Sequence, residues 1–325
     1  PAAIRRAEPE PVPAPIPTHL DRIERVARSL GHSVGMRLLL SLAAASALVS
    51  CSSSPGAAPA QPPMPLRLQV GELVFDAVMA GPQDGELVLL LHGFPQTSYS
   101  LRAQLAALAD AGYRAVAFDQ RGYSPGARPA GVDEYAIPRM IEDTVGIADV
   151  LGRKRFHVVG HDWGAVVAWF TAMAHPARVR TVTALSVPHP FAFSRAAADP
   201  GGDQAQRSAY MLRLREPEAA DALLANDAAE LRAVYTDGVD AAAIDVYLEA
   251  LGSREALDAA LNWYRAMAAT TPYPPLTPIV MPALYVWSTE DPTMSREGAE
   301  LTAEFVEGPY RFEVLEGVGH WIPEE

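Results

Sequence analysis

A short stretch from Phe156 to Ala174 constrains the fold more than any other part of the chain. An apolar run predicts a buried strand, Gly160-His161-Asp162-Trp163-Gly164 follows it, and an apolar helical pattern comes next. The glycines two positions before and after Asp162 allow a turn that is too tight for larger side chains. This is the strand–turn–helix arrangement of a nucleophile elbow, with Asp162 at the position of the nucleophile.

The nucleophile of such an elbow is usually a serine, and an aspartate at this position predicts a different reaction. A carboxylate is a poor nucleophile toward acyl carbon, because the adduct would be an anhydride. It can displace a leaving group from saturated carbon and form an ester, which an activated water must then hydrolyse. Asp162 therefore predicts alkylation of the enzyme followed by hydrolysis, on substrates such as epoxides or alkyl halides. The alternative is a glycine-rich turn in which Asp162 only caps the helix that follows.

The overall composition limits the class of protein. The chain has 325 residues, of which 49% are hydrophobic and 20% charged, as expected for a globular protein rather than a disordered one. Its formal net charge of −13 argues against a nucleic-acid partner, because nucleic-acid backbones attract basic surfaces. Cys51 is the only cysteine, so neither an intrachain disulfide nor a cysteine-based metal site is expected.

Residues 1–65 are expected to lie outside the folded core. Met36-Arg37 precedes an apolar run that is too short to span a membrane as a stable helix, and Ser50-Cys51 follows it. This pattern is typical of a signal peptide from Met36 to Ser50. Its end resembles a bacterial lipoprotein cleavage box, so a lipidated Cys51 would anchor the protein to a membrane, with residues 52–65 as a linker. The alternative is a disordered extension on a cytoplasmic enzyme, and both interpretations stay open.

From residue 66 onward, strand and helix patterns alternate, which predicts an α/β fold with a mostly parallel sheet covered by helices on both faces. From residue 188 to about residue 275, helical stretches dominate and no strand is evident, so residues 188–275 are expected to form a helical cap. The core then comprises residues 66–187 and 276–325, and its second part is expected to be truncated before a closing helix. The expected strands are 66–70, 73–79, 86–91, 113–118, 156–159, 181–187, 283–287 and 310–315.

Hydrolysis of an ester on Asp162 requires a general base, and His320 is the best-placed histidine. It lies in a glycine-containing loop after the last predicted strand, and the loops that follow parallel strands converge at one edge of a sheet. Asp291, in the turn after the strand that ends at Trp287, is the expected partner of the imidazole, with Glu290 as the alternative. The chain order of nucleophile, acid and base is that of the α/β-hydrolase fold.

The hydrolysis step would pass through an oxyanion on the carboxyl carbon of Asp162. Two backbone N–H groups are expected to form the oxyanion hole, namely those of Trp163, which follows the nucleophile, and of Phe94 in His92-Gly93-Phe94-Pro95. Loss of one such donor typically raises the barrier by about 3–4 kcal/mol. An ordinary Gly-Pro loop is the alternative interpretation of the motif around Phe94.

From about residue 66 to its end, the chain resembles the epoxide hydrolases of the α/β-hydrolase superfamily. The segments that carry the resemblance are His92-Gly93-Phe94-Pro95, Asp119-Gln120-Arg121-Gly122-Tyr123 and Gly160-His161-Asp162-Trp163-Gly164. Two further segments, Leu261–Arg265 and Tyr210–Pro217, look like those that carry the ring-opening tyrosines in that family. The resemblance therefore implies that Tyr264 and Tyr210 hold the epoxide oxygen. Taken alone, each would more often be a packing residue of a cap helix.

The resemblance implies an epoxide hydrolase that converts a small-molecule epoxide and water to a vicinal diol through an aspartyl ester, without a cofactor or a metal. The alternative enzyme is a haloalkane dehalogenase with the same triad of Asp162, Asp291 and His320. In that enzyme the indole of Trp163 would donate to the halide, whereas Phe94 has no side-chain donor. A third interpretation is an inactive α/β-hydrolase that only binds ligands. A broken triad would mark such a protein, and none is evident.

Overall fold

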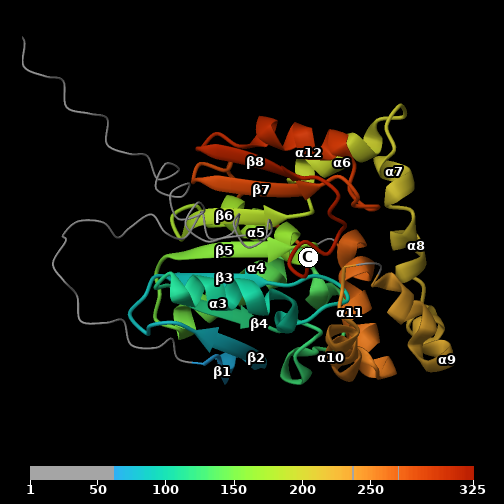
Figure 1. Ribbon diagram of the computed structural model, residues 1–325, viewed down its shortest axis with the longest axis horizontal. Helices are drawn as coiled ribbons and strands as arrows, with labels where there is room; N and C mark the ends of the chain where they lie inside the picture. The colour runs from blue at the N-terminus through green and yellow to red at the C-terminus, as the bar shows by residue number, and fades with distance from the viewer. Residues whose placement is uncertain (1–61, 236–237, 270) are drawn as a thin grey trace, which may run out of the picture. The chain divides into compact units, whose positions relative to one another are not determined.

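The computed structural model describes residues 62–235, 238–269 and 271–325 (Figure 1). The predicted signal segment from Met36 to Ser50, Cys51 and most of the predicted linker lie outside these residues. Within the described part of the chain, no helix is long and apolar enough to cross a membrane.

The centre of the fold is an eight-stranded sheet with the order β1-β2-β4-β3-β5-β6-β7-β8. The pairs β1–β2 and β2–β4 are antiparallel, and every other neighbouring pair is parallel. The predicted mostly parallel sheet is therefore confirmed. The strands are β1 (Met64–Val70), β2 (Leu73–Ala80), β3 (Leu87–Leu91), β4 (Arg114–Phe118), β5 (Phe156–His161), β6 (Val179–Leu185), β7 (Ala283–Ser288) and β8 (Tyr310–Leu315).

The central strands are buried because helices cover both faces of the sheet. Every residue of β3 and β5 is buried, as expected for parallel strands that are packed on both faces. In Figure 1 the sheet runs across the molecule with helices in front of it and behind it. The helices of this part are η1 (Ser98–Leu101), α3 (Arg102–Asp110), η2 (Pro125–Ala127), η3 (Val132–Tyr135), α4 (Ile137–Val150), α5 (Trp163–Ala174), α12 (Arg296–Leu301) and η5 (Thr302–Phe305).

Between β6 and β7 the regular secondary structure of the described residues is helical, apart from one isolated bridge at Ile279. In Figure 1 these helices are yellow to orange, and α7 to α11 lie at the right of the sheet. They are α6 (Pro190–Ala198), α7 (Gln204–Arg207), α8 (Tyr210–Leu214), α9 (Ala219–Val234), α10 (Ala241–Leu251), α11 (Arg254–Arg265) and η4 (Ala266–Ala268). We refer to this helical segment as the cap, and its bounds at residues 188 and 275 remain a prediction.

Helix α11 connects the cap to the core. Its start is capped by Ser253, whose hydroxyl accepts from the N–H of Ala256. The helix is strongly amphipathic, and its buried face includes Trp263 and Tyr264. The indole of Trp263 donates to the backbone carbonyl of Arg121 at 2.7 Å, in the loop that follows β4. This contact fixes the end of α11 against the core and directs Tyr264 toward the elbow between β5 and α5.

Candidate active site

Asp162 lies at the turn between β5 and α5 with φ 52° and ψ −121°, a conformation that few non-glycine residues adopt. A Cβ atom at Gly160 would come within 2.0 Å of the carbonyl oxygen of Gly164. A Cβ atom at Gly164 would come within 2.1 Å of the carbonyl oxygen of Leu91. Both positions therefore require glycine, and the turn holds Asp162 in a backbone conformation that costs on the order of 1–3 kcal/mol.

The two carboxylate oxygens of Asp162 have different partners. Oδ1 accepts the backbone N–H of Phe94 at 2.9 Å, and a Cβ atom at Gly93 would come within 2.3 Å of the same oxygen. Oδ2 lies 3.6 Å from Nε2 of His320. The N–H of Trp163 belongs to the first turn of α5, where N–H groups have no partner within the helix. One oxygen is thus held by a loop, while the other faces the imidazole.

Asp291 and His320 form a buried pair beside Asp162. Nδ1–H of His320 donates to Oδ2 of Asp291 at 2.9 Å, which leaves Nε2 facing the nucleophile. Oδ1 of Asp291 accepts from the hydroxyl of Thr293 at 2.7 Å and from its N–H at 2.8 Å. Glu290, the alternative acid, is exposed. The structure thus brings the three predicted triad residues together in the order Asp162, His320, Asp291.

Electrostatic interactions within this triad set the charge of the imidazole. Burial alone would lower the pKa of His320, but the carboxylates of Asp291 and Asp162 outweigh it and raise the pKa to about 10. Burial would raise the pKa of Asp291, but the imidazole and the hydroxyl donors around it hold that pKa far below its usual range. In the resting state at neutral pH, His320 is therefore protonated between two carboxylates.

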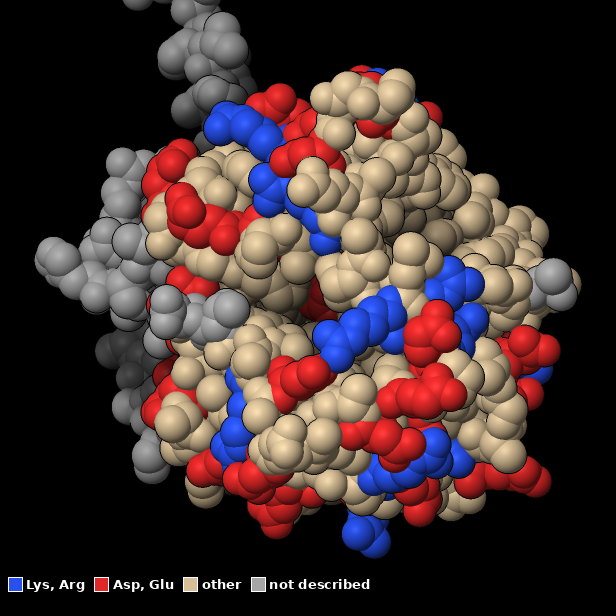
Figure 2. All heavy atoms as spheres, turned by 90° about the vertical axis from the view of Figure 1, so that its right-hand side faces the viewer, with Lys and Arg blue, Asp and Glu red and all other residues tan. Residues whose placement is uncertain are grey.

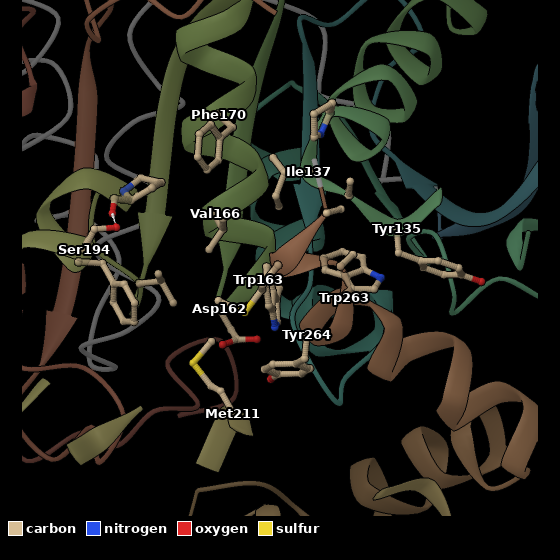
Figure 3. Close-up of a pocket in the computed structure, with 18 of the residues that line it drawn as sticks. Tyr135, Ile137, Asp162, Trp163, Val166, Phe170, Ser194, Met211, Trp263 and Tyr264 are labelled. Carbon is tan, nitrogen blue, oxygen red and sulfur yellow. Dashed lines mark hydrogen bonds between the residues drawn. The ribbon is translucent and has the colours of Figure 1, made fainter. Parts of the chain in front are cut away.

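Tyr264 and Tyr210 bring two phenols to the same place from different cap helices. Tyr264 is buried, and its ring lies edge-on to Phe94 at 5.3 Å and to Trp163 at 5.2 Å. The Tyr210 residue is 38% exposed, yet its hydroxyl is buried and forms a hydrogen bond with Tyr264. Figure 3 shows the Asp162 carboxylate beside the ring of Tyr264. Burial raises the pKa of both phenols well above the ordinary value, so both remain O–H donors.

Two cavities meet at these residues, with volumes of about 290 and 520 Å³, and Asp162, Tyr210 and Tyr264 line both. The smaller cavity has mainly apolar and aromatic walls, including Val166 and Phe170. The larger one extends past Phe94 and Trp321 to Arg213 and Glu230, which form an ion pair. Figure 2 views the molecule from the cap side and shows a hollow with red atoms of an acidic residue deep inside it. A substrate atom at the junction would contact the carboxylate and the phenols together.

Comparisons with known proteins show the family to which the chain belongs. The family described as "alpha/beta hydrolase fold" matches residues 86–325. Epoxide hydrolase A of Mycobacterium tuberculosis is 38% identical, over 76% of this chain and 88% of its own length. The chain belongs to the epoxide hydrolase family of the α/β-hydrolase superfamily.

Solved structures of the epoxide hydrolase family superpose over most of this member. Epoxide hydrolase A from Mycobacterium thermoresistibile has a TM-score of 0.71 and 31% identity, covering 81% of this chain and 94% of that one. A mutant epoxide hydrolase from Bacillus megaterium, complexed with its product, a naphthyloxy-propane-diol, has a TM-score of 0.71 and 26% identity. That comparison covers 80% of this chain and 94% of the other.

In this epoxide hydrolase family member, two residues of the site were not foreseen from the sequence. The hydroxyl of Ser186 donates to Oδ2 of Asp291 at 2.7 Å, from a position that directly follows β6. His161 is buried with its pKa lowered to about 4, chiefly by burial, so it is neutral, and its Nε2–H donates to the carbonyl of His320 at 2.8 Å. Neither residue could be predicted from a local sequence pattern, because the roles depend on the positive φ of Ser186 and on hydrogen bonds between distant parts of the chain.

The polar groups of Asp162, Asp291 and His320 have partners within the chain itself, whereas the buried Nδ1 of His161 has none among the described residues. Over the residues that the structure describes, no cluster of three or more His, Cys, Asp or Glu side chains could hold a metal ion. The catalytic roles of Asp162, Asp291, His320, Tyr210 and Tyr264, and the oxyanion role of Phe94 and Trp163, remain predictions.

Proposed function

We propose that this protein hydrolyses an epoxide to a vicinal diol through a covalent ester on Asp162. The observation that carries the proposal is the placement of one buried carboxylate between two protonated phenols and an imidazole, at the junction of two cavities. The epoxide hydrolases similar to this chain, one of them bound to a diol product, support the same chemistry.

In the first half of the reaction, Oδ2 of Asp162 attacks one carbon of the epoxide and the bond from that carbon to the ring oxygen breaks. The phenols of Tyr210 and Tyr264 donate hydrogen bonds to that oxygen as negative charge develops on it. Asp162 loses its charge when it becomes an ester, and one of the two carboxylates that raise the pKa of His320 is then gone. The proton given up by His320 balances the one taken up by the former epoxide oxygen.

In the second half, the neutral imidazole of His320 takes a proton from water, whose oxygen attacks the carboxyl carbon of Asp162. Charge develops on Oδ1, which already accepts the N–H of Phe94, and the N–H of Trp163 is the second donor expected there. Breakage of the ester bond releases the alkoxide of the diol, which takes the proton left on the carboxyl group. Asp162 is again a carboxylate, and His320 again carries a proton.

The direct test of this proposal is to trap the ester. His320→Gln keeps a polar side chain but removes the base, so incubation with styrene oxide is expected to add one substrate mass to the peptide that contains Asp162. The matched control Asp162→Asn, which lacks a carboxylate nucleophile, is expected to remain unmodified. Intact and peptide mass spectrometry measure both. An unmodified His320→Gln protein would contradict the proposal and would favour a protein that only binds ligands.

The haloalkane dehalogenase alternative is less compatible with this site. The indole of Trp163 forms a hydrogen bond with Tyr264, and no polar side chain is present at Phe94. Both cavities instead present phenols to Asp162. We therefore expect diol formation from styrene oxide and no halide release from 1-bromobutane, measured side by side with the same enzyme preparation. Halide release that exceeds diol formation would reverse the assignment.

A further inference from the structure

A tyrosine of the cap contacts the loop that presents the N–H of Phe94 to Asp162. Tyr235 is buried directly after α9, and its hydroxyl donates to the backbone carbonyl of Pro95 at 2.6 Å. We propose that Tyr235 is a positioning residue for the second half of the reaction, because it holds the turn that carries the Phe94 donor. This inference rests on the proposed function.

The turn from Gly93 to Gln96 is held by several contacts, and the bond from Tyr235 is the one that reaches Pro95. It is closed by the N–H of Gln96, which donates to the carbonyl of Gly93 at 2.9 Å. Pro95 has no N–H group, so its carbonyl is its only polar group, and that carbonyl is the acceptor for Tyr235. Pro95 is itself buried. Removal of the Tyr235 hydroxyl would leave a buried carbonyl without this partner, and the turn would have to shift to satisfy it.

The ring and the hydroxyl of Tyr235 contact different residues. It lies 5.5 Å from the ring of Tyr247 and 5.5 Å from the ring of Trp321, which follows His320 in the chain. A phenylalanine at position 235 would keep both ring contacts and remove only the bond to Pro95. Tyr235→Phe is therefore expected to affect the loop that carries the Phe94 donor, while the ring packing beside Trp321 and His320 is kept.

The two halves of the reaction depend differently on the Phe94 donor. During alkylation, the negative charge on Asp162 decreases, so a weaker hydrogen bond to Oδ1 does not slow the attack by Oδ2. During hydrolysis, charge grows on Oδ1, and a displaced donor raises the barrier. A general displacement of the cap would instead move Tyr210 and Tyr264 and slow alkylation. The ratio of the two rates therefore separates a positioning role of Tyr235 from a merely structural one.

The test is a single-turnover experiment on the Tyr235→Phe enzyme with styrene oxide, quenched at successive times and analysed by intact mass. We expect an alkylation rate within about twofold of the unaltered enzyme and ester hydrolysis that is slower by roughly three- to tenfold, the size of one lost hydrogen bond. The ester would accumulate as a result. The matched control is Tyr247→Phe, which removes another buried cap phenol that bonds to the carboxylate of Glu324. No ester should accumulate in that variant.

Three results would overturn the inference: unchanged ester hydrolysis in Tyr235→Phe, equal slowing of both halves, or equal accumulation of ester in Tyr247→Phe. Absence of any ester in His320→Gln would instead overturn the proposed function, and this inference with it. The two failures are therefore distinguishable.

Discussion

Ser186 shows how a single residue connects backbone strain to the triad. Its φ of 70° is rare for a side chain of this type. The conformation is held by its N–H, which donates to the carbonyl of Val286 at 2.9 Å, and by its carbonyl, which accepts from the hydroxyl of Tyr285 at 2.7 Å. The result is that Oγ reaches Asp291 on the same oxygen that accepts from His320.

Ser186→Ala is expected to slow ester hydrolysis by about tenfold, because Asp291 loses a buried hydrogen bond of roughly 1–1.5 kcal/mol. The matched variant Ser186→Gly lacks the same hydroxyl but tolerates positive φ, so it should slow hydrolysis equally while unfolding at a higher temperature than Ser186→Ala. Single-turnover rates and thermal unfolding measure the two effects. Normal hydrolysis in both variants would show that the hydroxyl does not orient Asp291.

The charge of Asp162 is expected to control the protonation of His320. Because the carboxylates of Asp291 and Asp162 raise the pKa of His320 to about 10, replacing one of them with a neutral group must lower it. Asp162→Asn imitates the loss of charge in the ester, so its His320 should titrate at a lower pH than in the unaltered enzyme. An NMR titration of the imidazole tests this. An unchanged or higher pKa would contradict the proposed release of the proton during alkylation.

At the scale of elements, the sequence was informative where burial produces a pattern. Strand β3 is a continuous apolar run and β5 is mostly apolar and fully buried, and each was predicted to within two residues at either end. The strand expected at 181–187 instead forms β6 from Val179 to Leu185, because Ser186 turns the chain out of the sheet with a positive φ. Motifs in the sequence predicted the triad and the two phenols. Contacts between the cap and the core could not be predicted in this way.

Helix α7 illustrates such a contact. The side chain of Gln204 is fully buried, donates to the carbonyl of Thr293 at 2.9 Å and accepts the N–H of Ser295 at 2.8 Å. Its partners are about ninety residues away in the chain and belong to the loop that follows Asp291. No periodicity or motif around Gln204 predicts these partners, because polar contacts between distant segments depend on the tertiary structure.

Gln204→Met keeps the volume of the side chain but removes the partner of the part-buried carbonyl of Thr293 and of the buried N–H of Ser295, both in the loop that follows Asp291. We expect it to lower the free energy of unfolding by roughly 2–4 kcal/mol. The control is Gln206→Met on the exposed side of the same helix, which should stay within about 0.5 kcal/mol. Urea unfolding followed by circular dichroism compares them. Equal stability of the two variants would show that the Gln204 bonds do not contribute to holding α7 on the core.

At the scale of the whole molecule, the buried histidines are expected to set the dependence of stability on pH. Burial lowers the pKa of His161 and of His189 to about 4, so between pH 6.5 and 4 the unfolded chain binds protons that the folded protein does not. Stability therefore falls as the pH decreases through this range, by up to roughly 3 kcal/mol for each group. The raised pKa of His320 affects the alkaline side of the stability curve. The protonated imidazole stabilises the folded protein fully below pH 6.5, and this stabilisation is lost as the pH rises through about 10.

We therefore expect the free energy of unfolding to be greatest near pH 6.5 and to decrease toward pH 5 and toward pH 9, measured by urea unfolding. His189 caps α6 by accepting the N–H of Phe191, so His189→Asn keeps an acceptor at the cap but cannot titrate. It should weaken the decrease on the acid side and leave the alkaline side unchanged. Stability that increases toward pH 5 would contradict the assignment of neutral buried histidines.

In the proposed reaction, the oxygen of the attacking water enters the carboxyl group of Asp162 and not the diol of the same turnover. A single turnover with excess enzyme in ¹⁸O-labelled water, followed by mass spectrometry of the diol and of the peptide that contains Asp162, tests it most directly. We expect an unlabelled diol, because one of its oxygens comes from the epoxide and the other from Asp162, together with one ¹⁸O atom in the peptide. A labelled diol and an unlabelled peptide would show that water opens the ring directly and that no ester forms on Asp162.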